Sequence, residues 1–245
     1  MRSRKQRKSF PLEKKKKKRN TTSNVLCDMN FPHVFRFQNT DAWKRAAGDE
    51  ILKDAPNPFL LALSGGSTPA PVYEELTKRV FPWESVSVFL ADERCVPPDH
   101  PDANAKLIRE SFSVPAQFFF PETTSPDCGA KHYETLFQHQ GGVFDVAVLG
   151  IGPDGHIASL FPHSSVLSEN HSLVTTSETE RFAVRQRITF TLPVLLNAKK
   201  LVVLLKGKSK EEVLTEWFAG SLSPEEFPAK YVLEHSNSFV FFCEE

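Results

Sequence analysis

The sequence lacks long apolar runs. Its 245 residues contain no stretch of about 18 apolar residues, the minimum for a transmembrane helix. The basic N-terminus is not followed by the apolar segment of a signal peptide, which argues against a secretory leader. We therefore expect a cytoplasmic protein that has no contact with a membrane.

Cysteine is scarce and scattered. Cys27, Cys95, Cys128 and Cys243 lie far apart and show no spacing typical of a metal site. His, Asp and Glu form no pair with ligand spacing either, so the sequence predicts no metal. In the absence of a secretion signal, we expect reduced thiols rather than disulfides.

The net charge is zero, but the two signs are separated along the chain. Residues 1–19 hold eleven Lys/Arg and one Glu, whereas the other 226 residues hold 19 basic and 29 acidic groups. The run Lys14–Arg19 offers no apolar surface to bury, so residues 1–24 are predicted to form a basic disordered tail. Residues 2–19 are also typical of a weak polyanion contact or of nuclear entry, with a solvated extension as the alternative.

Short apolar runs alternate with amphipathic segments between residues 25 and 245. Strands are predicted at 58–64, 86–90, 118–120, 144–149, 187–192, 201–205 and 238–242, and helices at 70–79, 103–112, 130–139 and 209–218. This alternation is typical of an α/β protein with a mainly parallel twisted sheet and helices on both faces. No internal repeat or linker interrupts residues 25–245, so we expect a single Rossmann-like domain and a monomer.

Three glycines precede a single histidine in residues 150–162 (GIGPDGHIASLFP), directly after a predicted buried strand. A tight turn followed by a helix start would place His156 beyond the carboxyl end of that strand, where open α/β sheets bind ligands. An imidazole titrates near neutral pH and can accept or give a proton. The sequence therefore predicts that His156 is a catalytic acid–base residue.

The same glycines match the Gly-x-Gly-x-x-Gly fingerprint of dinucleotide-binding proteins. In that class the motif normally opens the domain, and an acidic residue about 20 positions later binds the ribose. Here the motif lies in the middle of the chain, and Asp154 would face the pyrophosphate. Nicotinamide binding is therefore the less favoured alternative, and we expect no cofactor.

A second glycine turn, Ser64–Pro69, joins a predicted strand to a predicted helix. Gly65 and Gly66 allow close approach of a ligand, and the hydroxyls of Ser67 and Thr68 add hydrogen-bond donors at a helix start. The turn lacks the lysine of a Walker loop, so nucleotide hydrolysis is not implied. The pattern favours phosphate binding over an ordinary capped turn.

Charged side chains follow other predicted strands at the same edge of the sheet. Asp92 and Arg94 come directly after one strand, and Lys210 begins the helix after another. The planar guanidinium of arginine suits phosphate or carboxylate, and an aspartate can orient a hydroxyl or assist proton transfer. Each of these residues, and Arg187 as well, could be a surface charge; together they indicate a phosphorylated substrate.

Five motifs follow one another in order over about residues 58–232: LSGGSTP, ADERCVPPDHPDAN, LGIGPDGHIASLFP, RITFTLPVLLNA and LLKGKSK. They resemble the 6-phosphogluconolactonase branch of the sugar-phosphate family that also contains glucosamine-6-phosphate deaminases. The resemblance implies metal-free hydrolysis of 6-phospho-D-glucono-1,5-lactone in the oxidative pentose phosphate pathway, with His156 as general base and acid and Asp92 as an acidic site residue. It implies substrate binding by Gly65, Gly66, Ser67, Thr68, Arg94, Asn104, Arg187 and Lys210.

Two other functions stay as alternatives. The first is a deaminase-like isomerase. In the deaminase branch the histidine motif resembles Gly-His-Ile-Ala-Phe-Asn-Glu-Pro, and its glutamate transfers protons. Phe161 stands at that position here and cannot move a proton, so the lactonase is favoured. A non-catalytic sugar-phosphate sensor would use the Ser64–Pro69 turn but has no use for His156. The expected partner is therefore a small phosphorylated sugar lactone.

Overall fold

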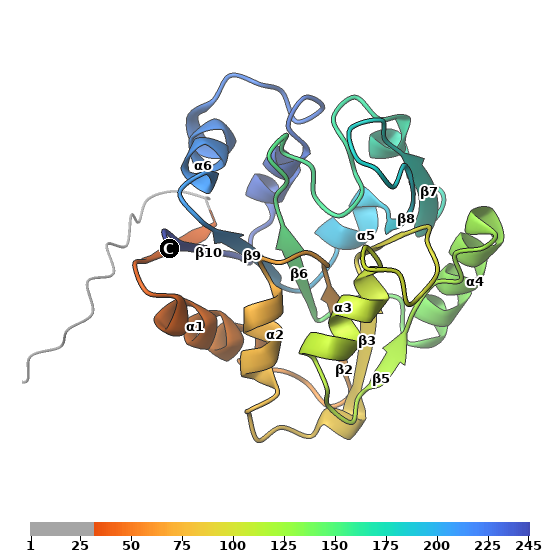
Figure 1. Cartoon of the computed structure of the whole chain (residues 1–245), viewed down its shortest axis with the longest axis horizontal. Coiled ribbons are helices and arrows are strands. Elements are labelled where there is room, and N and C mark those ends of the chain that lie inside the picture. Colours follow the sequence, from red (N-terminus) through yellow and green to blue (C-terminus); the bar gives the residue numbers. More distant parts are fainter. Residues whose placement is uncertain (1–31) are drawn as a thin grey trace, which may run out of the picture.

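The computed structural model describes residues 32–245 and contains two β-sheets (Figure 1). The predicted tail, residues 1–24, lies outside the described residues. The larger sheet has seven parallel strands in spatial order: β1 (His33–Phe37), β10 (Ser238–Cys243), β9 (Leu201–Lys206), β6 (Val146–Gly150), β2 (Phe59–Leu63), β3 (Val86–Leu90) and β5 (Gln117–Phe119). The smaller sheet is antiparallel, in the order β4 (Asp92–Arg94), β8 (Gln186–Phe190) and β7 (Val174–Glu178).

Helices cover both faces of the larger sheet (Figure 1). One face packs against α1 (Thr40–Leu52), α2 (Ala70–Leu76) and α3 (Asn104–Ser111). The other packs against α4 (Pro126–His139), α5 (Leu192–Leu196), α6 (Lys210–Ala219) and the smaller sheet. Short 3₁₀ helices occur at Trp83–Ser85, Ser165–Ser168 and Pro228–Glu234. Among the described helices, none is both long enough and apolar enough to cross a bilayer.

The central strands are apolar on both sides because successive side chains point to opposite faces of a strand. In β2, Leu60 and Ala62 belong to the core beneath α4, α5 and α6. Leu61 and Leu63 belong to the core beneath α1, α2 and α3. The sheet therefore separates two hydrophobic cores, and the mainly parallel α/β fold predicted from the continuous apolar runs is confirmed.

The prediction that a helix begins after the 150–155 glycine turn is wrong. Residues 151–164 form turns and one isolated bridge, between Ile157 and Leu160. Gly155 and Ala158 have φ angles of 82° and 48°, which no right-handed helix allows. The dinucleotide alternative loses its physical basis, because no helix N-terminus is present there to bind a pyrophosphate.

Some elements differ from the sequence-based expectation. The predicted 187–192 strand pairs in the smaller sheet, as β8, and not in the parallel one. The elements β1, α1 and β7 were not predicted, because charged and hydroxyl side chains break up their apolar patterns. The helix predicted at 209–218 corresponds to α6, which begins one residue later; Ser209 precedes it and makes no capping hydrogen bond with its side chain.

Candidate active site

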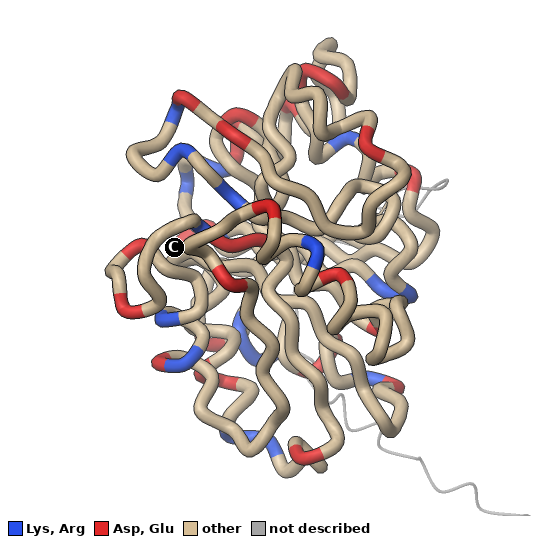
Figure 2. Tube along the Cα trace, turned by 90° about the vertical axis from the view of Figure 1, so that its right-hand side faces the viewer, with Lys and Arg blue, Asp and Glu red and all other residues tan. Residues whose placement is uncertain are grey.

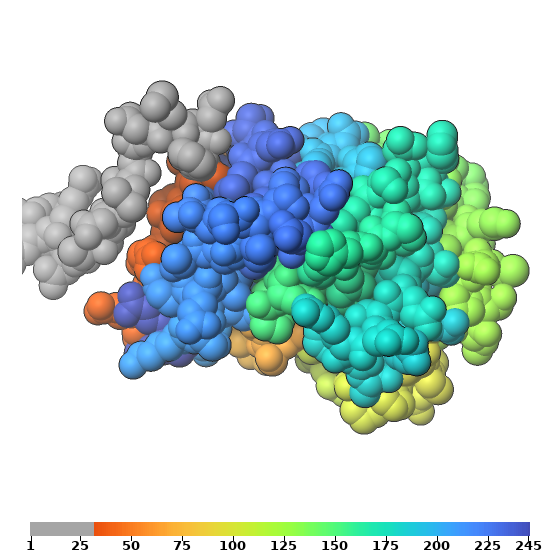
Figure 3. Space-filling view, turned by 90° about the horizontal axis from the view of Figure 1, so that it is seen from above, coloured from red at the N-terminus to blue at the C-terminus, as the bar shows by residue number. Residues whose placement is uncertain are grey.

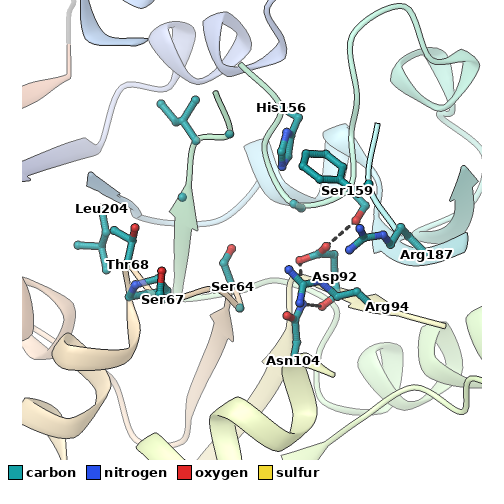
Figure 4. Close-up of a pocket in the computed structure, with 18 of the residues that line it drawn as sticks. Ser64, Ser67, Thr68, Asp92, Arg94, Asn104, His156, Ser159, Arg187 and Leu204 are labelled. Carbon is teal, nitrogen blue, oxygen red and sulfur yellow. Dashed lines mark hydrogen bonds between the residues drawn. The ribbon is translucent and has the colours of Figure 1, made fainter. Parts of the chain in front are cut away.

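A pocket opens at the carboxyl edge of the larger sheet (Figure 4). It lies between the turn after β2, the strand β4, the start of α3, the turn after β6 and the β7–β8 connection. The pocket brings together all the predicted site residues except Lys210: Gly65, Gly66, Ser67, Thr68, Asp92, Arg94, Asn104, His156 and Arg187. Residues from five separate segments of the sequence therefore face one cavity.

Lys210 lies behind the pocket wall and does not line it. Its Nζ donates a hydrogen bond to the carbonyl oxygen of Ile151 at 2.6 Å. Burial lowers the pKa of Lys210, and the nearby charge of Asp154 opposes that shift. The ammonium group thus contacts the first residue of the turn after β6. Direct contact of Lys210 with the substrate stays a prediction.

The imidazole of His156 is paired with a carboxylate that the sequence interpretation overlooked. Asp154 Oδ1 lies 2.5 Å from His156 Nδ1, and the two side chains are 9% and 19% exposed. Because Nδ1 faces this carboxylate, Nε2 is the nitrogen that can act on a ligand. The signal in the sequence is an acid two residues before a histidine in a glycine turn; the sequence-based interpretation gives Asp154 no role beyond opposing a pyrophosphate.

The second oxygen of Asp154 is also occupied. Arg181 Nη1 donates to Asp154 Oδ2 at 2.6 Å. Burial by itself would raise the pKa of Asp154, but its contacts with His156 and Arg181 outweigh burial and hold the pKa well below its ordinary value. The carboxylate is therefore ionised at neutral pH and has a fixed orientation.

Two aromatic rings flank His156. The Phe161 ring lies 5.0 Å from the imidazole, and the Phe182 ring lies 5.5 Å from it, nearly edge-on. Phe161 is 5% exposed, and both rings line the pocket. This wall is apolar at the position where a deaminase-like motif would have its glutamate.

Asp92 is held at the floor of the pocket by neighbours from two other segments. Its Oδ2 accepts a hydrogen bond from Ser159 Oγ at 2.5 Å, and its backbone oxygen accepts one from Asn104 Nδ2 at 2.8 Å (Figure 4). The carbonyl of Ser159 in turn accepts from Ser177 Oγ at 2.8 Å. Ser159 is fully buried and was not singled out from the sequence.

Gly65 has no space for a side chain. A Cβ atom at this position would collide with the carboxamide of Asn104. Asn104 Oδ1 and Ser64 Oγ are buried and have no hydrogen-bond partner among the described residues. Because buried polar atoms are normally paired, these two oxygens fit a polar ligand beside the glycine turn.

Two arginines lie directly opposite each other in the smaller sheet. Arg94 of β4 is the register partner of Arg187 of β8, and both line the pocket. Burial lowers the pKa of Arg187; the charge of Asp92 opposes that shift and the charge of Arg94 adds to it. Like charges on opposed cross-strand residues are destabilising, so this pair favours a bound anion that offsets the repulsion.

The cations of the pocket are a local feature. Residues 32–245 carry 19 Lys/Arg and 28 Asp/Glu, and both signs are spread along the fold (Figure 2). The net charge of residues 32–245 therefore opposes a negatively charged ligand at long range. Within these residues, no group of three or more His, Cys, Asp or Glu is arranged to hold a metal ion, and Cys95, Cys128 and Cys243 are free thiols.

Comparison with known proteins agrees with this geometry. Residues 40–241 match the family described as glucosamine-6-phosphate isomerases/6-phosphogluconolactonase. A 6-phosphogluconolactonase of Synechocystis is 39% identical over 186 residues, covering 70% of this chain and 76% of that protein. One of Nostoc is 36% identical over 188 residues, covering 71% and 77%. The crystal structure of 6-phosphogluconolactonase from Thermotoga maritima has a TM-score of 0.75 at 29% identity, covering 86% of this chain and 99% of that one. The chain belongs to the glucosamine-6-phosphate isomerase/6-phosphogluconolactonase family.

Proposed function

We propose that this protein hydrolyses 6-phospho-D-glucono-1,5-lactone to 6-phosphogluconate in the oxidative pentose phosphate pathway. The carrying observation is the Asp154–His156 pair, which shares one pocket with two opposed arginines and the hydroxyl-bearing glycine turn. Relatives that share more than a third of their aligned residues with this chain are named for that activity. The site supplies an acid–base group and anion-binding groups, the two things this reaction needs.

His156 acts first as a base. Its Nε2 takes a proton from a water molecule as the water oxygen attacks the lactone carbonyl carbon. Asp154 stabilises the imidazolium that forms and keeps Nδ1 protonated. When the tetrahedral intermediate collapses, the bond to the ring oxygen breaks and His156 returns the proton to that oxygen. This cycle leaves the enzyme unchanged and uses no metal ion.

Phosphate binding orients the lactone. Gly65, Gly66, Ser67 and Thr68 offer backbone and hydroxyl donors, and the arginines add charge. Binding energy from the phosphate, remote from the reacting carbon, is thereby used to fix the ring against His156. The substrate-binding role extends to Asn104, and we assign Lys210 to the support of the turn.

The developing oxyanion needs a donor that is still free. The amides of Gly152 and Gly155 donate to His156 O and Gly152 O, at 2.8 and 3.1 Å. The His156 amide donates to Asp154 Oδ1 at 3.3 Å. Since these amides are engaged, a cation of the pocket is the better partner for the oxyanion.

The decisive measurement is acid release from freshly prepared lactone, corrected for spontaneous hydrolysis. Lactonase activity that depends on His156 supports the proposal. Tight binding of 6-phosphogluconate without turnover would point to the sensor alternative. Release of ammonia from glucosamine 6-phosphate would point to the deaminase alternative.

We infer further that the enzyme works as a cytoplasmic monomer. Sedimentation at micromolar concentration tests the monomer, and fractionation of cells tests the compartment. Nuclear entry and polyanion contact through residues 2–19 stay predictions, since those residues lie outside the described part of the chain.

A further inference from the structure

The connection between β7 and β8, residues 179–185, reaches across to the histidine turn (Figure 3). It is a tight loop: the Thr179 amide donates to Arg185 O at 3.1 Å, and the Arg181 amide donates to Thr179 Oγ1 at 3.2 Å. Thr179 is 7% exposed, which anchors the base of the loop. Two consecutive residues at its tip are therefore held in defined positions.

These two residues contact both members of the acid–base pair. Arg181 donates to Asp154 Oδ2 at 2.6 Å, across 27 residues of sequence. Phe182 lies 5.5 Å from His156 and 6.0 Å from Phe161, ring centre to ring centre. The guanidinium of Arg187 lies 5.8 Å from the centre of the same Phe182 ring. One loop thus contacts the carboxylate, the imidazole and an anion-binding cation.

We propose that Arg181 is a positioning residue of the active site, acting on His156 through Asp154. This inference rests on the proposed lactonase function. A carboxylate bound at one oxygen only can rotate about its Cβ–Cγ bond. With Arg181 on Oδ2, Oδ1 stays directed at Nδ1, and the imidazole keeps Nε2 toward the substrate.

The other charged side chains near Asp154 and His156 have different partners from Arg181. Lys210, near Asp154, is engaged with the Ile151 carbonyl, and Asp92 is engaged with Ser159. Arg94 and Arg187 face the pocket from the smaller sheet. Among the described residues, Arg181 is the cation that donates a hydrogen bond to Asp154.

Arg181→Met tests this positioning role, because methionine retains an apolar stem without the charge. We expect kcat on the lactone to fall about tenfold while KM changes less than about twofold, as for other outer partners of a catalytic group. Arg181→Lys should recover part of the loss. Arg185→Ala is the matched control, because Arg185 lies in the same loop and pairs with Glu178 and Glu180, away from the histidine.

A second readout does not require turnover. Nitrogen-detected NMR of the His156 ring, assigned with His156→Asn, reports whether Nδ1 holds its proton. In the wild type this proton should exchange slowly; in Arg181→Met it should exchange about tenfold faster, and in Arg185→Ala it should not change. If the wild type lacks lactonase activity but the NMR difference is present, the positioning role stands and the proposed function fails. Unchanged kcat and unchanged exchange in Arg181→Met, or equal losses in Arg185→Ala, would overturn the inference.

Discussion

Asp154 and His156 are two residues apart in the sequence, and a 2.5 Å contact joins Asp154 Oδ1 to His156 Nδ1. The turn that makes this contact possible has a left-handed backbone at Gly155, where φ is 82°. A side chain at Gly155 would also collide with the ring of Phe227. The acid–base pair is therefore a product of the local backbone, and the pocket around it is built by distant segments.

Replacing His156 with asparagine should lower kcat by about 10²-fold or more, since a general base is lost while shape is retained. The substitution should leave the melting temperature and 6-phosphogluconate binding nearly unchanged. Initial rates on fresh lactone are the measurement, with exposed His132→Asn as the control. A near-normal rate for His156→Asn would remove the histidine from the mechanism.

Asp154→Asn should make stability less dependent on pH in the acid range. The pKa of Asp154 is depressed in the folded protein, so its contribution is present above the unfolded pKa of about 4 and is lost as pH falls through the lower folded pKa. Thermal melts should show the variant less stable than the wild type at pH 7, with a smaller difference at pH 3. Replacing the exposed Asp99 with asparagine should change the melting temperature at neither pH. A stability difference between wild type and Asp154→Asn that grew as the pH fell would contradict the depressed pKa of Asp154.

Gly65→Ala should weaken both the fold and substrate binding. The added methyl group would push against Asn104, and overpacking of this kind costs roughly 1–3 kcal/mol. We expect a lower melting temperature together with a raised KM. Gly48→Ala in α1 is the control, because a Cβ there meets its nearest neighbour, Leu76, at 3.5 Å. Equal behaviour of the two alanine variants would show that the turn tolerates a side chain.

The unmodified protein should release no ammonia from glucosamine 6-phosphate, and Phe161→Glu should not create that activity. Phe161 is buried against His156, so a carboxylate there should cost roughly 3 kcal/mol or more. Chemical denaturation measures this loss, and Phe161→Leu should cost less because it stays apolar. Efficient deamination by the wild type would overturn the choice of lactonase.

Deleting residues 1–24 should leave kcat and melting temperature unchanged, because this basic segment has few apolar residues with which to dock. Affinity for a polyanion such as DNA should disappear with the deletion. In the full chain that affinity should fall steeply with added salt, as counterion release requires. A tenfold loss of lactonase activity on truncation would mean that the tail supplies a substrate contact; absence of DNA binding at low salt would leave only a solvated extension.

Several residues of the pocket could be predicted because they lie in short sequence motifs that follow apolar strands. Gly65, Thr68 and His156 follow directly after apolar strands, and in a parallel sheet the ends of such strands meet at one edge. The contacts that complete the site join distant segments: Ser159 meets Asp92 across 67 residues. No local pattern in the sequence gives that distance.

The second sheet also escaped prediction. The strand β4 has only three residues, and it depends on pairing with β8, more than ninety residues later. Strand register comes from that long-range pairing, so the opposition of Arg94 and Arg187 cannot be deduced from spacing. The predicted role of Lys210 rested on its position after a strand, which could not show that its amine turns toward Ile151.

Because Arg94 and Arg187 lie opposite each other in the smaller sheet, binding of an anion between them is coupled to the stability of the folded protein. With the pocket empty, two partly buried guanidinium groups repel each other across one pair of strands. Any anion that bridges them removes this repulsion in the native state and finds no such pair in the unfolded chain. Ligand occupancy therefore adds to the free energy of unfolding in proportion to the logarithm of ligand concentration. A bound anion would accordingly make the folded protein more resistant to unfolding, and its removal would reverse this effect.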